Sequence, residues 1–241
     1  SDGLGRPVDL SAAVSSGQSA LEADWFISNL PDRAIGLEAV DLMLITNSDT
    51  GQLTPSQRDA IRNWVFGGGH LIVTGGSRWE ETAAGVSGLL PFVPSDSELS
   101  SDFGDLSGLA GSSTVPTSIN AVIARGTLAE NSLVLASSEA GEPLAARHTM
   151  GYGLVDYLSF DPASQPFLVW DGMKSIWFSL VSSRDVRPGW SYGFLNLRQG
   201  YNAVEILPGV TALPEALAMV GFLLFYVVLI GPVNYFILSR L

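Results

Sequence analysis

The stretch that decides the fold runs from residue 41 to residue 76 and reads DLMLITNSDTGQLTPSQRDAIRNWVFGGGHLIVTGG. It contains two short apolar runs, LMLI and HLIVT, which are typical of strands that are buried on both faces. Between them, Thr54 fits a helix N-cap, Pro55 the first helical position and Gln57 the third residue of a capping box. The glycines at 67–69 then end the helix. A strand, a helix and a strand in this order predict a βαβ unit with parallel strands covered by helices.

The α/β pattern continues towards the C-terminus. The next segment, residues 91–118, is rich in Ser, Gly and Asp and predicts a loop insertion. Apolar runs and an amphipathic pattern then predict further elements. These are strands at 119–124, 132–136 and 154–160, a shorter strand at 142–147 before the Gly151–Gly153 turn, and a helix over 167–182.

We therefore expect a three-layer α/β domain with a mostly parallel, flavodoxin-like sheet over residues 30–185. Residues 1–29 form an N-terminal segment that is either separate from this domain or part of it. A Pro- and Gly-punctuated linker follows over 186–212, and a transmembrane helix is expected over 213–241.

The expected membrane span is the apolar stretch from Ala216 to Ser239, ALAMVGFLLFYVVLIGPVNYFILS, which carries no charged residue. A helix of about 20 apolar residues is long enough to cross the hydrocarbon core. The alternative is a buried hairpin of a globular core. Phe222 lies within the stretch, and Tyr226 and Tyr235 suit its interfaces. The last third holds Pro232 and Asn234, which indicate either packing against another helix or a kink with a snorkelling asparagine.

The charges that flank this stretch predict its orientation. Arg240 follows it, whereas the chain as a whole has a formal net charge of −12. Since basic residues favour the cytoplasmic side, we expect a single-pass protein with its domain outside the cytoplasm. The expected partners are the lipid bilayer and other membrane or envelope proteins. A native chain is expected to continue beyond Leu241.

Composition excludes several kinds of site. The chain has no cysteine, which removes disulfides, thiolate metal sites and a cysteine nucleophile. Its acidic charge makes nucleic acid an unsuitable partner. His70 and His148 lack metal-ligand spacing, and the acidic residues at 95–105 lack the spacing of a calcium-binding loop, so a solvated loop is favoured there. No metal or cofactor is expected.

Three segments together carry a resemblance to a known family. They are VDLMLI with LTPSQRDAIRNWVFGGGHLIVTGG, the segment YGLVDYLSFDPASQPFLVWDGMKSIWFSLV, and the tail ALAMVGFLLFYVVLIGPVNYFILSRL with its Gly-Pro-x-Asn-Tyr sequence. In this order the chain resembles noncatalytic class I glutamine amidotransferase-like domains of uncharacterised bacterial membrane proteins. The resemblance covers most of residues 30–241 and implies a domain outside the membrane.

The resemblance also defines the residues that an enzyme of this family would need. Catalytic members place a cysteine on a turn after a buried strand and pair it with a histidine. Here the corresponding turn offers Ser77, for which His148 is the candidate base and Asp156 or Asp161 the orienting group. Ser77 and Asp161 also have ordinary structural explanations. Serine follows glycines in many turns, and Asp161 precedes a proline, where aspartate commonly begins a turn.

Three functions follow from these observations. The preferred one is a noncatalytic interaction or scaffold module of a larger membrane or envelope complex, because the family's nucleophile is missing. The alternatives are a serine-dependent hydrolase or amidotransferase-like enzyme that uses Ser77 and His148, and a sensor of a small ligand. The sensor would bind its ligand at the carboxyl ends of the strands, where open α/β sheets form their binding crevices.

Overall fold

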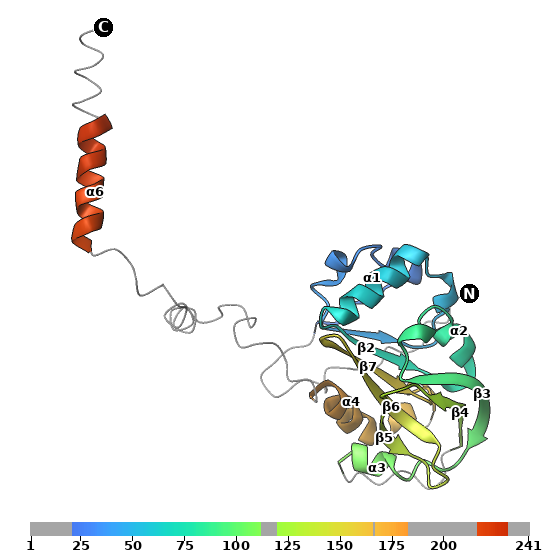
Figure 1. The fold of residues 1–241 in the computed structure, drawn as a ribbon. Coiled ribbons are helices and arrows are strands. Elements are labelled where there is room, and N and C mark those ends of the chain that lie inside the picture. The colour runs from blue at the N-terminus through green and yellow to red at the C-terminus, as the bar shows by residue number, and fades with distance from the viewer. Residues whose placement is uncertain (1–20, 112–119, 166, 183–215, 231–241) are drawn as a thin grey trace. The chain divides into compact units, whose positions relative to one another are not determined.

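The computed structural model describes residues 21–111, 120–165, 167–182 and 216–230. The chain divides into two compact units, Ser1–Asp185 and Val186–Leu241. The first unit is the α/β domain, and Figure 1 labels most of its helices and strands. Its strands are β1 (Leu42–Ile45), β2 (His70–Thr74), β3 (Phe92–Ser100), β4 (Ala121–Leu128), β5 (Leu133–Ser137), β6 (Pro143–Met150) and β7 (Gly153–Leu158). Its α-helices are α1 (Pro55–Phe66), α2 (Trp79–Ala84), α3 (Leu106–Leu109) and α4 (Gly172–Ser182).

The βαβ unit is confirmed. β1 and β2 pair in parallel, and α1 begins at Pro55 behind a complete capping box. The Thr54 hydroxyl accepts from the backbone N–H of Gln57 at 3.2 Å, and the Gln57 side chain accepts from the backbone N–H of Thr54 at 2.9 Å. The helix ends at the glycine run, where Gly68 adopts a φ of 118°. Only glycine takes up this conformation without strain.

The prediction of a mostly parallel sheet is wrong. The five-stranded sheet has the order β1-β2-β7-β6-β5, in which β1, β2 and β7 are parallel while β6 and β5 are antiparallel to their neighbours. The β6–β7 connection explains why. Only Gly151 and Tyr152 join Met150 to Gly153, and a two-residue turn can join only antiparallel strands.

A second antiparallel pair, β3 and β4, replaces much of the expected loop insertion. β3 spans nine residues, Phe92–Ser100, although its sequence FVPSDSELS reads as polar. Its side chains do not alternate between apolar and polar because most of them remain at least partly exposed at this edge. The pair is joined to the main sheet by a backbone hydrogen bond of 2.7 Å from Ala124 N to the Ser159 carbonyl.

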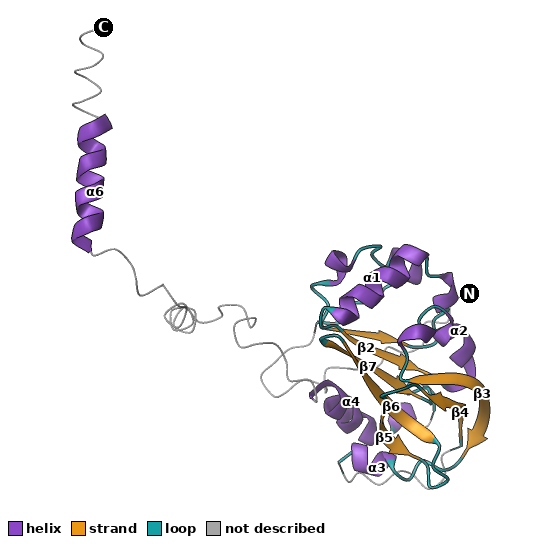
Figure 2. Cartoon of the chain, in the orientation of Figure 1, coloured by secondary structure: helices purple, strands orange, loops and turns teal. Residues whose placement is uncertain are grey.

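Helices cover both faces of the five-stranded sheet, as Figure 2 shows. Alternate residues of β2 therefore enter two separate cores. Leu71 and Val73 pack in the core that contains α1, whereas Ile72 packs in the core that contains α4. β7 divides in the same way, with Tyr157 on the α1 side and Leu158 on the α4 side. The central strands β2 and β7 are thus buried on both faces.

The predicted membrane span is also wrong. In the second unit, α6 covers Ala216–Val228, which is 13 residues. No helix within the described residues is both long and apolar enough to cross a membrane. The predicted single-pass location depended on that span and is corrected with it. Phe222 and Tyr226 lie on α6 with 70% and 54% of their surfaces exposed, whereas the predicted span residues Pro232, Asn234 and Tyr235 lie outside the described residues.

Candidate functional site

Ser77, the candidate nucleophile, lies at the carboxyl ends of the parallel strands. It is exposed in a short 3-10 turn, Gly76–Arg78, that follows β2. Gly76 has a φ of 83°, and a Cβ atom there would lie 2.8 Å from Cβ of Asp161. Ser77 and Asp161 are therefore neighbours at this edge of the sheet, as the parallel strands require.

His148, the candidate base, lies towards the other end of the sheet. On β6 it is opposite Val155, which in turn is opposite Leu71 near the start of β2. Ser77 lies six residues beyond Leu71, and β6 is two strands away from β2. Since a strand advances about 3.3 Å per residue and strands lie about 4.8 Å apart, the separation is on the order of 10 Å or more. The structure does not bring Ser77 and His148 within the roughly 3 Å that a nucleophile and its base need.

His148 has a different neighbour. Its Nδ1 atom lies 3.4 Å from the hydroxyl oxygen of Ser132, next to the start of β5. The pairing of β6 with β7 places His148 on the same face as Val155, which belongs to the α1-side core. Asp156 is on the opposite face, so it does not orient His148.

Asp156 instead forms the centre of a buried charged network. Its Oδ1 accepts from Nε of Arg147 at 2.6 Å, and its Oδ2 accepts from a terminal nitrogen of the same guanidinium at 2.6 Å. Nε2 of His70 lies 2.8 Å from Oδ2. The side chains of Asp156 and His70 are 0% and 1% exposed, and that of Arg147 is 12% exposed. The sequence reasoning missed His70 in this role.

The protonation of this network follows from its contacts. Burial by itself raises the pKa of Asp156, but the hydrogen bonds and charges of Arg147 and His70 outweigh it and hold that pKa below its ordinary value. An ionised carboxylate only accepts hydrogen bonds, so Nε2 of His70 carries the proton between them. The same guanidinium donates to the backbone carbonyl of Leu180 at 3.0 Å, near the C-terminus of α4. The network therefore joins β2, β6 and β7 to the end of a helix, where a cation is favoured.

Asp161 is engaged at the carboxyl edge. The Asn47 side-chain amide donates to Oδ2 of Asp161 at 2.7 Å, and the Ala163 backbone N–H donates to Oδ1 at 2.9 Å. Asn47 follows β1 with a φ of 48°, a conformation that asparagine tolerates better than most residues. The result is a side-chain bridge from the end of β1 to the end of β7.

Three further contacts close this edge. A terminal nitrogen of Arg78 donates to the Asn47 carbonyl at 2.8 Å, and the guanidinium forms an ion pair with Glu81. Below them, the Thr74 hydroxyl donates to the Thr46 hydroxyl oxygen at 3.0 Å. Asn47 and Arg78 at this edge, and Thr46 and Thr74 at the strand ends, are therefore held by bonds within the protein.

Two hollows on the described surface lie elsewhere. One, of about 540 Å³, lies over α3 and α4 and is lined by Leu109, Lys174 and Phe178 among others. The other, of about 490 Å³, lies between the Ala34 turn and α1. Neither is lined by Ser77, Asp161 or their neighbours.

The acidic residues at 95–105 are also used within the fold. Glu98 forms an ion pair with Arg125 at 2.9 Å, Asp102 accepts from the backbone of Ala140, and Asp105 accepts from the Ser137 hydroxyl. Among the described residues, no group of three or more His, Cys, Asp and Glu side chains is placed to hold a metal ion.

Among the side chains of the described residues, one buried polar atom has no hydrogen-bond partner, the Tyr157 hydroxyl oxygen. Its ring stacks on Phe92 with a centroid separation of 5.4 Å, and burial raises its pKa. A Cβ atom on Gly75 would lie 2.7 Å from the hydroxyl oxygen, so the turn after β2 closes over it. The hydroxyl is therefore covered by the chain rather than presented to a ligand.

Comparison with known proteins supports the fold and leaves the function open. No model of a known protein family matches the chain, and no curated protein matches it. It is similar to the solved structure of cytoplasmic protein STM3548 from Salmonella typhimurium, at 14% identity and a TM-score of 0.52, over 66% of this chain and 77% of that one. A second protein, cytoplasmic protein STM1381 from Salmonella typhimurium LT2, matches at 19% identity and a TM-score of 0.49, over 65% and 76%.

A third match is to part of an enzyme, an exo-β-1,4-mannosidase from Opitutaceae bacterium strain TAV5. Its identity is 17% and its TM-score 0.39, over 61% of this chain and 25% of that one. At these identities, only the likeness with the TM-score of 0.52 supports an argument, and that argument concerns the fold alone.

Proposed function

We propose that the α/β domain is a noncatalytic interaction module. One observation carries the proposal: the edge at which open α/β sheets bind substrates and ligands is closed here by the protein's own groups. Asn47 binds Asp161 across it at 2.7 Å, and Arg78 binds the Asn47 carbonyl and Glu81. These contacts stabilise the edge, because the amide, carboxylate and guanidinium groups that meet there bond to one another.

The enzyme alternative lacks its base. Ser77 is exposed, but His148 is on the far part of β6 and His70 is buried against Asp156. The chain contains only these two histidines and no cysteine. A serine without a base beside it gains no activation, so Ser77 is best explained as a turn residue.

The sensor alternative needs space at the same edge. A small-molecule site is normally a concave pocket with a few converging polar groups. The two described hollows lie over other elements, and the edge residues bond to one another. These observations favour a domain that acts through its outer surface.

Two measurements on the full chain test the proposal together. A fluorophosphonate probe should not label Ser77, with the Ser77→Ala variant as the matched control. A photo-crosslinking amino acid placed in turn at the exposed positions Tyr152, Leu99 and Val169 should give discrete protein adducts in the source cells from at least one position. Labelling of Ser77, or the absence of adducts from every position, contradicts an interaction module.

A further inference from the structure

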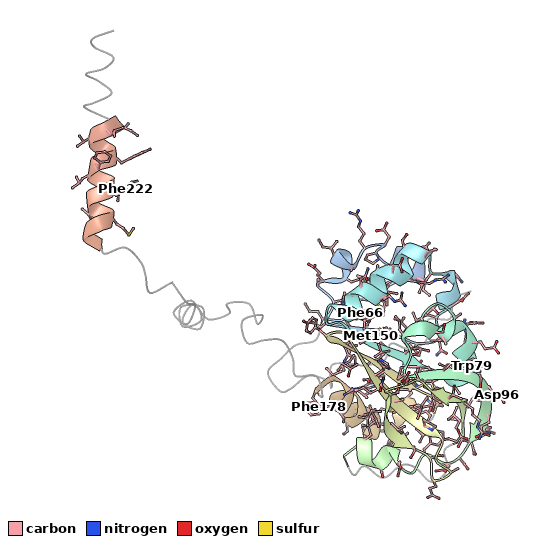
Figure 3. All side chains as sticks on the ribbon, in the orientation of Figure 1. Phe66, Trp79, Asp96, Met150, Phe178 and Phe222 are labelled. Atoms are coloured by element: carbon pink, nitrogen blue, oxygen red, sulfur yellow. The ribbon has the colours of Figure 1, made fainter. Side chains whose placement is uncertain are left out.

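One exposed surface combines charge and aromatic side chains in a line along α1. Arg58, Arg62 and Phe66 follow one another at intervals of four residues, so they lie along the same side of the helix. Tyr152 continues the line, because its backbone N–H donates to the Phe66 carbonyl at 3.0 Å. We call these four residues the α1 stripe. Figure 3 labels Phe66 at this end of the domain, beside Met150.

The arginines of the stripe differ from most basic residues of the domain. Within the described residues, Arg78, Arg125, Arg147 and Lys174 each form an ion pair with a carboxylate. Arg58 and Arg62 form none with any carboxylate that the structure describes, although the chain carries a formal net charge of −12. The Nε atom of Arg58 donates to the Leu53 carbonyl at 3.1 Å, which holds the side chain while leaving its terminal nitrogens available.

The aromatic part of the stripe is exposed on a rigid backbone. The Phe66 and Tyr152 side chains are 45% and 90% exposed. Gly151 holds the turn with a φ of 62°, and a Cβ atom there would lie 2.7 Å from the Phe66 carbonyl oxygen. The capping box fixes the N-terminal end of α1, and the two-residue turn that holds Tyr152 is bonded to its C-terminal end, so neither ring lies on a long loop that binding would have to order. Exposed tyrosine and arginine are the residues that most often dominate binding energy at protein interfaces.

The free edge of β3 is a weaker candidate for an interface. Its ladder is interrupted by a bulge between Pro94 and Asp96, and Asp96 and Glu98 place charges along it. Proline, a bulge and charge are the features that prevent strand addition at a sheet edge. Figure 3 shows Asp96 at this outer strand.

From these observations we propose that the α1 stripe binds an acidic protein segment that also carries a large apolar side chain. The carboxylates pair with Arg58 and Arg62, and the apolar side chain packs on Phe66 and Tyr152. This proposal rests on the interaction module proposed above and names its surface and the chemistry of its partner. Asp59 is the only carboxylate on α1, and it is exposed, so it opposes such a partner.

A defined peptide tests this directly. The probe is a fluorescein-labelled twelve-residue peptide of Glu, Leu and Ala, and its control replaces every Glu by Lys. The full chain should bind the acidic peptide and not the basic one, and binding should weaken as salt rises. The Arg58→Gln/Arg62→Gln variant should weaken binding about fivefold, since each exposed ion pair contributes little. Tyr152→Ser should weaken it about tenfold.

Two further variants control the experiment. Asp59→Asn should strengthen binding, and Leu99→Ser, which changes an exposed apolar residue on β3, should leave it unchanged. Equal binding of both peptides, or no effect of the stripe variants, overturns the proposed surface. If that happens while photo-crosslinked adducts still form from Leu99 or Val169, the interaction module stands and only its assigned surface fails. If no position gives adducts, the function fails as well.

Discussion

Replacing Asp156 by asparagine keeps the shape of the side chain and removes its charge. The carboxylate accepts two hydrogen bonds from Arg147 at 2.6 Å and lies 2.8 Å from His70, and its side chain is fully buried. An asparagine presents one oxygen and one NH₂ group, so at least one donor is left facing another donor. The Arg147 guanidinium, 12% exposed, then stays largely buried and loses the Asp156 charge that faces it.

The expected loss follows from these contacts. Breaking a buried ion pair by removing one partner costs about 3–5 kcal/mol, since the remaining charge stays desolvated. Domains of ordinary stability have about 5–15 kcal/mol in total. We therefore expect Asp156→Asn to lower the free energy of unfolding by about 4 kcal/mol and the melting temperature by roughly 10 °C.

Urea titration of the full chain measures this loss. Tryptophan fluorescence reports on unfolding, because Trp64, Trp170 and Trp177 are buried in the domain. The matched control is Asp171→Asn, since Asp171 pairs with Lys174 at 3.2 Å but is 93% exposed. This control should change stability by less than about 0.5 kcal/mol. Equal effects of the two substitutions would refute the reasoning that burial makes the Asp156 network important.

Three other predictions follow from the structure. First, because the pKa of Asp156 is lowered on folding, its contribution is complete above the unfolded pKa of about 3.9 and is lost as the pH falls through the folded value. Acid titration of the wild-type chain should therefore lose stability below about pH 4 more steeply than Asp156→Asn. Second, Thr54→Ala removes the capping box of α1 and should cost about 1 kcal/mol in the same urea assay, whereas an unchanged midpoint contradicts the cap. Third, α6 exposes apolar side chains such as Phe222 and Leu224, 70% and 62% exposed, so the full chain should self-associate in buffer without detergent while a chain ending at Asp185 stays monomeric. Sedimentation velocity distinguishes these outcomes. If the full chain is monomeric as well as the shortened chain, the apolar surface of α6 does not drive self-association.

An element of the fold could be predicted where residues close together in sequence are enough to specify it. Thr54, Pro55 and Gln57 specify the start of α1 by hydrogen-bond chemistry that needs no distant partner, and the structure confirms it. The parallel pairing of β1 with β2 followed from the length of the connection. The orientation of β5 and β6 depends on the short turns at Ser138–Glu142 and Gly151–Tyr152, which join antiparallel strands. The βαβ pattern that predicted a mostly parallel sheet does not extend past them.

The other misses have physical causes of the same kind. β3 was not predicted because an edge strand needs no apolar alternation, and its pairing with β4 is non-local. The role of His70 could not be read from its own neighbourhood. Its partner Asp156 is 86 residues away in sequence, and Arg147, which binds the same carboxylate, is 77 residues away, so the network forms only when β2, β7 and β6 align. A charged residue inside the apolar run LVDYLSF was the available signal, because a buried aspartate requires a cation or several donors.

The candidate catalytic residues illustrate the limit of sequence reasoning about the site. Ser77 and Asp161 do lie at one edge, since both follow parallel strands. His148 does not join them because β6 runs antiparallel to β7, and the register places it beside Val155. The sequence places His148 shortly before a turn, and that position alone does not indicate at which end of the sheet the side chain lies.

The central claim is that the domain works through its outer surface and not through the carboxyl edge of its sheet. The most direct measurement compares photo-crosslinking from Tyr152 with photo-crosslinking from Ser77 in the full chain in its source cells. The account predicts discrete protein adducts from Tyr152, reduced by the Arg58→Gln/Arg62→Gln substitutions, and none from Ser77. Adducts or covalent small-molecule labelling at Ser77, with none at Tyr152, would contradict it.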